Sequence, residues 1–305
     1  MKLYLGVDGG QSGTAAVIGD ETGRILGTGE AGPCNHAAAA EGRAKLERAV
    51  SGSLAAACQE AGLDPATIQF AAACFGMSGG PDDKEQILAR IIRTEKLLVT
   101  TDAVIALAGA TPEGQGIITI GGTGSIAYGR NATGRAARAG GWGYVFGDEG
   151  GAFDIVRQAT RAALRVHEGW GAPTRLHDVL LEATGAADAN QMLHRFYGPE
   201  WPRSRVATLA RLVDRMAEEF DAVALDIVNR AAQDLAMLAM SVRAQLWHPG
   251  DSIYVAYIGG VFESPRILER FRLLVEMEGG VVCGPPHHGP AEGALFEARR
   301  LDRTA

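Results

Sequence analysis

The stretch LYLGVDGGQSGTAAVIGDETGR at residues 3–24 decides the fold, because its pattern returns as GIITIGGTGSIAYGRNATGR at residues 116–135. Each copy is an apolar run, a glycine-rich turn with small hydroxyl residues, a second apolar run and a polar turn that ends in Gly-Arg. Short apolar runs bounded by glycine and polar turn residues are typical of the strands of a hairpin. We therefore predict one hairpin at the start of each half of the chain.

Both hairpins carry a glycine pair between their strands, Gly9-Gly10 in the first copy and Gly121-Gly122 in the second. Glycine tolerates positive φ and lets backbone N–H groups surround an anion with no Cβ in the way. One such turn in each half predicts two related domains that hold a polyphosphate between them, which indicates phosphoryl transfer.

The composition is that of a folded protein of two domains. The chain has 305 residues, more than one hydrophobic core usually serves, and its 47% hydrophobic content argues against disorder. The formal net charge is −7 with no dense basic run, so we expect no nucleic-acid partner. The longest apolar stretches, such as 117–120 and 255–258, are strand-sized, and the N-terminus lacks an apolar leader. We therefore expect no membrane contact and a cytoplasmic location.

The cysteines are widely scattered and form no C-x-x-C pair: they are Cys34, Cys58, Cys74 and Cys283. That spacing is poor for a disulfide framework or a zinc site. We expect them to act as small buried side chains in a reducing compartment.

Strand-like and helix-like segments alternate along the chain, which predicts an α/β fold. Beyond the hairpins, strands are expected within 68–79, 96–102, 251–260 and 281–283, and helices at 37–62, 82–93, 102–110, 152–167, 265–278 and 291–300, with 174–248 largely helical. The segment TPEGQG at 111–116 is interpreted as a linker. We place one domain at 1–113 and a larger one at 114–305, whose last helix is able to pack back on the first domain.

Asp8 opens the first turn, directly after an apolar strand. Its carboxylate could hold Mg²⁺ through water, since Mg²⁺ keeps much of its hydration shell. An Asp that simply forms the turn explains the residue equally well when the turn is taken alone. The second copy of the turn favours the metal.

Neither glycine turn belongs to the common nucleotide motifs. The chain has no G-x-x-x-x-G-K-[ST] segment, and neither turn runs directly into a helix, as the dinucleotide fingerprint requires. The second turn, GGTGS at 121–125, offers only amide and hydroxyl donors. A Rossmann dehydrogenase is therefore disfavoured.

Asp102 ends an apolar strand and starts a helix. A carboxylate there could accept the proton of a hydroxyl that attacks a γ-phosphate. Plain N-capping is the alternative and, from the local sequence, the better one, although a helix start would hold a base in place equally well.

The loop GGWGYVFGDEGG at 140–151 is too rich in glycine for a core element. Its Trp142 and Asp148 suit a sugar, because they offer an apolar face and a strong acceptor for hydroxyls. A packed Trp that anchors an irregular loop is an equal alternative.

Two further turns lie toward the end of the chain. Gly259-Gly260, with Glu263, stands between a strand and a helix, where a planar ring could approach the backbone or the chain could simply turn tightly. His287-His288 lies in a proline-rich turn. Adjacent histidines rarely converge on one metal ion, so we predict a surface loop there.

Five segments in order resemble the N-acetylglucosamine kinase family: DGG at 8–10, TTDA at 100–103, GGTGS at 121–125, GGWGYVFGDEGG at 140–151 and IGGVFES at 258–264. That family belongs to the BadF-type ATPases within the sugar kinase/actin/Hsp70 superfamily. The resemblance covers nearly the whole chain and is weakest over roughly 170–245. It implies two ribonuclease-H-like (actin/hexokinase-type) domains with ATP–Mg²⁺ in an interdomain cleft, phosphorylation of a sugar 6-hydroxyl, and a homodimer.

The resemblance also implies roles for single residues. Asp102 falls at the position of the catalytic base and sugar ligand, and Asp8 at the acidic position that serves the metal. The residues implied in sugar binding are Asn35, Ser78, Asp102, Ser125, Gly141, Trp142, Gly143 and Asp148. The residues implied in nucleotide binding are Gly9, Gly10, Gln11, Ser12, Gly122, Thr123, Gly124, Gly259, Gly260 and Glu263.

Two positions depart from the family pattern. Gln11 replaces a glycine that is common in the first turn, which leaves the geometry of that turn open. Ile126 stands where the animal members have a sugar-binding Asn, and its side chain cannot hydrogen-bond a hydroxyl. N-acetylglucosamine leads among the substrates, with glucosamine, N-acetylmuramate, glucose and an anhydro sugar open.

The leading hypothesis is an ATP-dependent amino-sugar kinase. An ATPase that activates an acyl-CoA dehydratase or reductase is the second, disfavoured because no cysteine lies near the second turn, where such relatives hold an iron–sulfur cluster. A sugar sensor without turnover is the third. The retention of both Asp8 and Asp102 argues against it.

Overall fold

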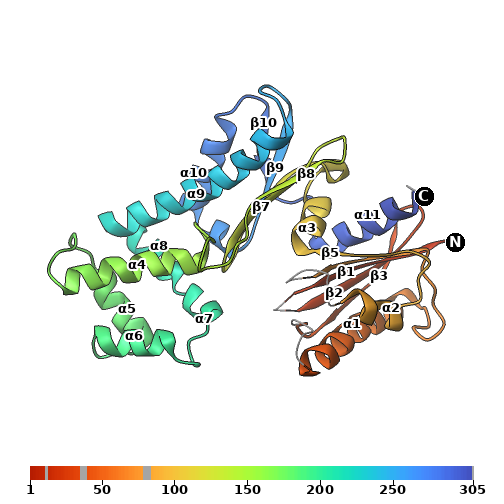
Figure 1. Cartoon of the computed structure of the whole chain (residues 1–305), viewed down its shortest axis with the longest axis horizontal. Coiled ribbons are helices and arrows are strands. Elements are labelled where there is room, and N and C mark those ends of the chain that lie inside the picture. Colours follow the sequence, from red (N-terminus) through yellow and green to blue (C-terminus); the bar gives the residue numbers. More distant parts are fainter. Residues whose placement is uncertain (11–12, 35–39, 78–83, 304–305) are drawn as a thin grey trace. The chain divides into compact units, whose positions relative to one another are not determined.

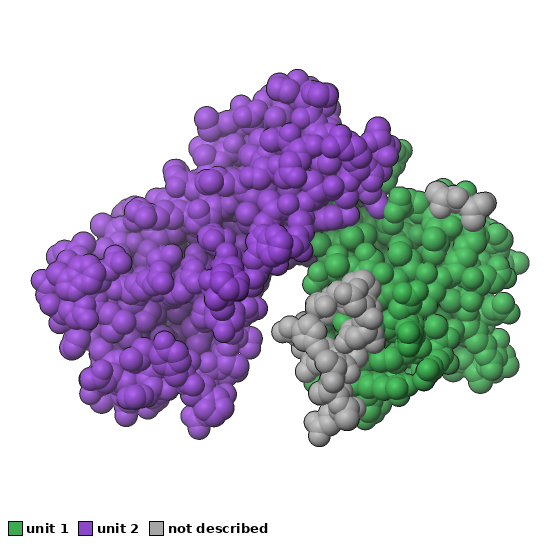
Figure 2. Space-filling view, in the orientation of Figure 1, with its two compact units in different colours: residues 1–116, 286–305 green, residues 117–285 purple. Residues whose placement is uncertain are grey.

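A computed structural model of the chain describes residues 1–10, 13–34, 40–77 and 84–303. The chain divides into two compact units, Met1–Gly116 together with Pro286–Ala305, and Ile117–Pro285 (Figure 2). Each unit is built on one five-stranded sheet. Four residues with predicted roles, Gln11, Ser12, Asn35 and Ser78, lie outside the described residues.

The sheet of the first unit has the strand order β3-β2-β1-β4-β5. Its antiparallel part is β1 (Leu3–Gly9), β2 (Thr14–Asp20) and β3 (Ile25–Ala31), and its parallel part adds β4 (Ala72–Met77) and β5 (Leu97–Thr101) to β1. The hairpin of β1 and β2 confirms the prediction for residues 3–24. The third strand, β3, was not predicted.

Helices cover both faces of this sheet (Figure 1). On one face lie α1 (Ala40–Ala61) and α2 (Glu85–Ile91), and on the other α3 (Asp102–Ala110) and α11 (Pro290–Arg303). The alternation of β1 explains the two cores, since Leu5 packs with the α1 side and Tyr4 with the α11 side. A short turn of 3-10 helix, Pro112–Gly114, follows α3 within the predicted linker.

The second sheet repeats the strand order of the first. Its strands are β6 (Gly116–Gly121), β7 (Ser125–Arg130), β8 (Ala136–Gly140), β9 (Ile253–Ile258) and β10 (Val281–Gly284), in the order β10-β9-β6-β7-β8. Taken from β8 to β10, this is the order of β3 to β5 in the first sheet, with β9 parallel to β6 and β10 parallel to β9. The repeated sequence pattern is therefore a repeated fold, and the α/β prediction is confirmed. As in the first unit, the third strand, here β8, was not predicted.

The helices of the second unit are α4 (Ala152–His167), α5 (Leu176–Thr184), α6 (Ala189–Tyr197), α7 (Arg203–Ala207), α8 (Ala210–Glu218), α9 (Ala222–Leu246) and α10 (Pro265–Glu276), with a 3-10 turn at Gly260–Glu263. The predicted helical stretch 174–248 is thus five helices. Its breaks have local causes: Gly185 takes the left-handed conformation at φ 63°, and the Asp221 carboxylate caps α9 by accepting from the amide of Ala224 at 3.0 Å.

Several smaller predictions are also settled. All four cysteines are buried, and burial raises the pKa of each thiol, so they act as small core side chains as predicted. His287 and His288 are exposed in a turn whose amides donate to the last carbonyls of α3, which confirms a surface loop. Among the described residues, none of the helices combines the length and the apolar composition that crossing a membrane requires.

The end of α11 is tied to the first unit by one carboxylate. Asp302 accepts hydrogen bonds from Lys2 Nζ at 2.7 Å, from the Tyr4 hydroxyl at 2.9 Å and from Lys96 Nζ at 3.1 Å. The three donors come from β1 and its start and from the residue before β5, so α11 is fastened across the parallel part of the sheet. These partners hold the pKa of Asp302 well below its usual range.

We expect Asp302→Asn to lower the melting temperature at pH 7, because the amide cannot replace a carboxylate that serves two ammonium groups. A carboxylate with a depressed pKa stabilises the fold above its unfolded pKa of about 3.9 and loses that effect as the pH falls below it. The difference between the two proteins should therefore shrink toward pH 3 in scanning calorimetry. Glu21→Gln, at an exposed carboxylate of the same unit, is the control. Equal melting temperatures at pH 7 would contradict the anchoring role.

Candidate active site

Two carboxylates meet at the carboxyl edge of the first sheet. Asp8 of β1 pairs with Gly76 of β4, and Gly76 pairs with Thr100 of β5. Asp102 comes two residues after Thr100, so it lies just beyond Asp8 in the direction of the strands. The carboxyl ends of parallel strands lie at one edge of a sheet, which is where α/β proteins bind ligands. Topology thus brings together two acids that are far apart in the sequence.

Asp8 is half-buried and Asp102 is exposed. Burial, together with the negative charge of Asp102, raises the pKa of Asp8 to about 6. Ionising Asp8 therefore costs free energy, because its carboxylate is partly buried and lies near a second negative charge. A bound cation would relieve that cost, and carboxylate oxygens are ligands that Mg²⁺ accepts.

Asp102 is the first residue of α3 rather than its cap. Thr101 occupies the N-cap position, and the Asp102 carboxylate accepts a hydrogen bond from the amide of Ala103 at 2.8 Å. The N-capping interpretation of Asp102 is thus wrong by one residue. The carboxylate still lies at the positive end of the helix dipole.

The first glycine turn closes on itself at its base. The amide of Gly10 donates to the carbonyl of Gly13 at 2.9 Å, and the Gly10 carbonyl accepts from the amide of Cys34 at 3.1 Å. Gly9 is packed so tightly that a Cβ there would lie 2.8 Å from the sulfur of Cys34. The turn is therefore fixed at both ends, with Asp8 at its start.

The second glycine turn is joined to the start of α4. The Gly122 amide donates to the Gly124 carbonyl at 2.9 Å, and the carbonyls of Gly122 and Thr123 accept from the first amides of α4, at 2.9 and 3.1 Å. Those amides would otherwise lack partners. The amides of Thr123 and Gly124 donate to no other described residue, which leaves two donors of the kind that surround a phosphate.

Asp148 and Ser125, both predicted to contact a sugar, lie together behind this turn. Asp148 is buried in a left-handed conformation with φ 65°, and its carboxylate accepts from the Ser125 amide at 3.4 Å and pairs with Arg203 at 3.6 Å. The Ser125 hydroxyl donates to the carbonyl of Glu149 at 2.6 Å. A Cβ on Gly124 would collide with the Asp148 carboxylate, so a larger residue there would displace that carboxylate.

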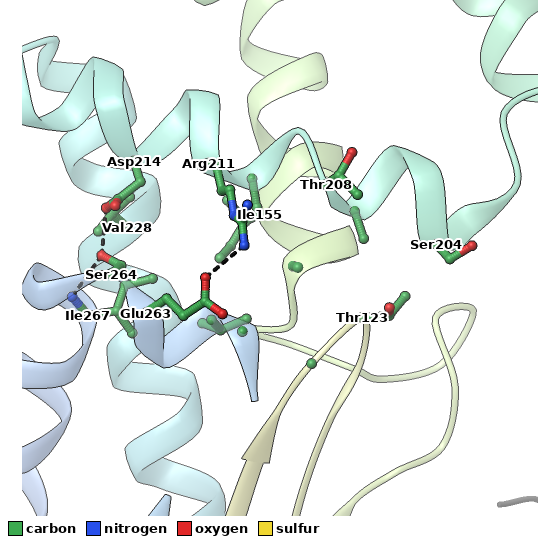
Figure 3. A pocket seen from close by; sticks show the side chains of 16 residues that line it. Thr123, Ile155, Ser204, Thr208, Arg211, Asp214, Val228, Glu263, Ser264 and Ile267 are labelled. Carbon is green, nitrogen blue, oxygen red and sulfur yellow. Dashed lines mark hydrogen bonds and ion pairs between the residues drawn. The ribbon is translucent and has the colours of Figure 1, made fainter. Parts of the chain in front are cut away.

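A pocket of about 550 Å³ opens in the second unit beside the second turn (Figure 3). Residues of the turn (Gly122, Thr123), of the strand-to-helix connection (Gly260, Glu263) and of α7 and α8 line it. Its floor is apolar, with Ile155, Val228, Val261 and Ile267, and its α7 side carries the small residues Ser204, Ala207 and Thr208. Four of the residues predicted to bind nucleotide thus share one pocket. An apolar slot rimmed by a few polar groups is suited to a flat heterocycle with a polar tail.

Two polar pairs join α8 to the strand-to-helix connection at this pocket, as Figure 3 shows. Arg211 Nη2 donates to Glu263 at 2.8 Å, and the Ser264 hydroxyl donates to Asp214 at 2.6 Å. Ser264 also caps α10 by accepting from the amide of Ile267 at 3.3 Å. These two hydrogen bonds connect α8 to the segment that follows the Gly259-Gly260 turn.

The loop with the exposed aromatic residues lies at the end of the β7–β8 hairpin. The Gly141 amide donates to the Ser125 carbonyl at 3.0 Å, and a Cβ on Gly141 would lie 2.7 Å from the Ile126 side chain. Trp142 is 66% exposed, and Gly143 has φ 80°. The interpretation of Trp142 as a packed anchor is wrong, because most of its surface faces solvent.

The sequence did not point to the pocket residues from α7 and α8. Arg211 and Asp214 stand in a helix whose apolar residues, Val213, Met216 and Ala217, predict only a buried face. The resemblance was weakest in this region. Only the folded chain brings α8 to the turn at Gly259-Gly260.

The model of the BadF/BadG/BcrA/BcrD ATPase family matches residues 5–298. The chain belongs to this ATPase family. It is 30% identical to the N-acetylmuramic acid/N-acetylglucosamine kinase of Clostridium acetobutylicum, with 91% of each chain covered. It is 29% identical to the N-acetyl-D-glucosamine kinase of Dictyostelium discoideum, with 88% of each chain covered.

Solved structures agree with this assignment. A crystal structure from Chromobacterium violaceum, of a protein proposed to be an N-acetylglucosamine kinase, superposes with a TM-score of 0.76 at 28% identity, covering 97% of this chain and 98% of that one. The predicted family and the two-domain actin-like fold are thus confirmed, and ATP use follows for this BadF-type protein.

We expect Asp8→Asn to stabilise the ligand-free protein in EDTA at pH 8. A carboxylate whose folded pKa is raised costs no stability below its unfolded pKa of about 3.9; the cost then grows as the pH rises and is complete above the folded pKa, here about 6. The free energy of unfolding should rise on the order of 2 kcal/mol at pH 8 and stay unchanged near pH 4. Urea denaturation at both pH values measures this.

Asp20→Asn in the same hairpin is the matched control and should act in the opposite direction. The Asp20 carboxylate accepts hydrogen bonds from Thr22, which lower its pKa. A loss of stability in both variants would contradict the account given for Asp8.

We expect Gly259→Ala to raise the KM for ATP at least about tenfold. Gly259 has φ 111°, and a Cβ there would collide with the carbonyl of Gly121, so the second turn must shift. Gly260→Ala is the control, because the nearest atom to its new Cβ would be a Glu263 oxygen at 3.9 Å. If the two variants changed the KM equally, the close approach of Gly259 would not control the pocket.

Proposed function

We propose that the protein is an ATP-dependent amino-sugar kinase that transfers the γ-phosphate to a sugar 6-hydroxyl, with N-acetylglucosamine as the leading substrate. The two relatives reported above, at 30% and 29% identity over most of each chain, are kinases of N-acetylated amino sugars. The family model matches residues 5–298, a range that includes both glycine turns and both acids.

The observation that carries the chemistry is the exposed Asp102 carboxylate beside the half-buried Asp8. In this proposal the Asp102 carboxylate accepts the proton of the 6-hydroxyl, and the hydroxyl oxygen forms a bond to the γ-phosphorus. The bond from the γ-phosphorus to the β–γ bridging oxygen breaks, and ADP leaves. Positioning and electrostatic stabilisation supply most of the rate.

Asp8 is the residue proposed to hold Mg²⁺. Its partly buried position next to a second carboxylate disfavours the ionised form of Asp8. A divalent cation bound nearby would favour the ionised form instead. When bound, the ion would neutralise charge on the phosphates. Asp8 would orient it from the strand end, with water completing the coordination.

The second turn and its pocket are proposed to hold the nucleotide. The amides of Thr123 and Gly124 would donate to phosphate oxygens, and the pocket lined by Gly260, Val261 and Ile267 would take the adenosine. Glu263, which accepts a hydrogen bond from Arg211, would accept another from a ribose hydroxyl. The sugar-binding roles of Ser125, Gly141, Trp142, Gly143 and Asp148, the cleft between the domains, the homodimer and the cytoplasmic location stay predictions.

We expect Asp102→Asn to reduce phosphoryl transfer at least about a thousandfold while nucleotide binding persists, because the amide cannot accept the proton. A coupled ADP-release assay with ATP–Mg²⁺ measures turnover across N-acetylglucosamine, glucosamine, N-acetylmuramate, N-acetylmannosamine and glucose. Calorimetric titration with ATP–Mg²⁺ measures binding. Glu30→Gln, an exposed carboxylate on β3, is the matched control and should turn over normally.

Other outcomes separate the alternative functions. Normal turnover in Asp102→Asn would remove this residue from the mechanism. ADP release that is independent of any sugar would favour an ATPase activator. Sugar binding without turnover in the wild-type protein would favour a sensor.

A further inference from the structure

Arg138 lies on the face of the β7–β8 hairpin that is turned away from the core. In the antiparallel register, Ile126 faces Gly140 and Tyr128 faces Arg138, while the alternate pair is Ala127 with Ala139. Ala127 is fully buried and Ala139 packs against the same core. Side chains alternate between faces along a strand, so Ile126 and Arg138 share the opposite face.

The side chain of Arg138 reaches the loop that carries Trp142. Its guanidinium carbon lies 4.3 Å from the centre of the Trp142 ring. Both side chains are exposed. A guanidinium carries N–H donors in a planar fork that matches the two oxygens of a carboxylate.

The charge of Arg138 is unmatched within the described residues. Two other arginines hold the same loop and are already paired: Arg203 with Asp148 at 3.6 Å, and Arg157 with Asp154 at 2.5 Å. No described carboxylate lies within ion-pair distance of Arg138. A surface cation–π contact alone is the simpler explanation for the Arg138–Trp142 contact. It does not account for the position of this contact beside the loop that is proposed to bind the sugar.

Ile126 adds an apolar contact next to this cation. It lies against Gly141, at the start of the same loop, and it cannot hydrogen-bond a hydroxyl. A sugar substituent that combines an alkyl group with a carboxylate would contact Ile126 and Arg138 together, whereas a bare hydroxyl has neither the alkyl group nor the negative charge. The lactyl ether of N-acetylmuramate has this chemistry.

We infer that Arg138 recognises a carboxylate on the sugar, and that acidic amino sugars of the N-acetylmuramate type are substrates of this protein. The inference rests on the proposed kinase function and adds a specificity-determining residue to it. The C. acetobutylicum relative, named for both N-acetylmuramic acid and N-acetylglucosamine, agrees with a substrate set of this breadth.

The test is the ratio of kcat/KM for N-acetylmuramate to kcat/KM for N-acetylglucosamine, measured on the full chain with ATP–Mg²⁺. Arg138→Gln should lower this ratio about tenfold to a hundredfold, the effect of losing a charge-assisted hydrogen-bond pair. Arg138→Lys should recover part of it, since the charge returns without the fork. Arg135→Gln, an exposed arginine at the turn of the same hairpin, should leave the ratio unchanged.

N-acetylmuramate methyl ester provides a second control. The ester has no charge, so the wild-type protein and Arg138→Gln should use it with equal kcat/KM relative to N-acetylglucosamine. An unchanged ratio for the free acid in Arg138→Gln would overturn the inference. So would a wild-type protein that phosphorylates N-acetylglucosamine but not N-acetylmuramate, and in both cases the kinase proposal would stand. No turnover with any sugar would overturn the kinase proposal itself.

Discussion

The close approach of backbone to backbone, at positions where only hydrogen fits as a side chain, is the constraint on which both units depend. In the second unit Gly259 lies against Gly121, and Gly151 lies against Gly124, so the second turn is enclosed by main chain on two sides. In the first unit Gly293 of α11 lies against the Ile105 carbonyl of α3. These approaches set the turns and helices at distances that larger residues would widen. The pocket beside the second turn depends on the contacts of Gly259 and Gly151.

The repeated hairpins and the helix at 152–167 could be predicted because apolar runs and glycine turns mark them directly. β3 and β8 could not, although they follow the Gly-Arg turns of the two copies. β3 contains Gly27 and Gly29, which lie so near the backbone of α1 that any Cβ would collide. β8 is mostly alanine. Their residues have low strand propensity, and tertiary packing rather than local preference makes them strands.

The candidate site divides in the same way. Asp8, Asp102 and the glycines stand at element ends, where sequence punctuation indicates a functional turn. Arg211, Asp214 and Arg203 stand inside helices, and their sequence shows only an amphipathic pattern. Their relevance arises from pairing with Glu263, Ser264 and Asp148, each far along the chain. The local sequence could not identify these residues, because their roles depend on contacts with residues that are distant in the sequence.

The position of α11 has a consequence for how the chain is made. This helix covers one face of the first sheet together with α3, yet all of residues 117–285 precede it in the sequence. A ribosome therefore completes the second unit while Tyr4, Val17 and Cys74 still lie on a face that α3 alone covers in part. The first unit is thus synthesised in two parts, residues 1–116 before the second unit and residues 286–305 after it. During synthesis its half-built core is the surface that a chaperone would meet.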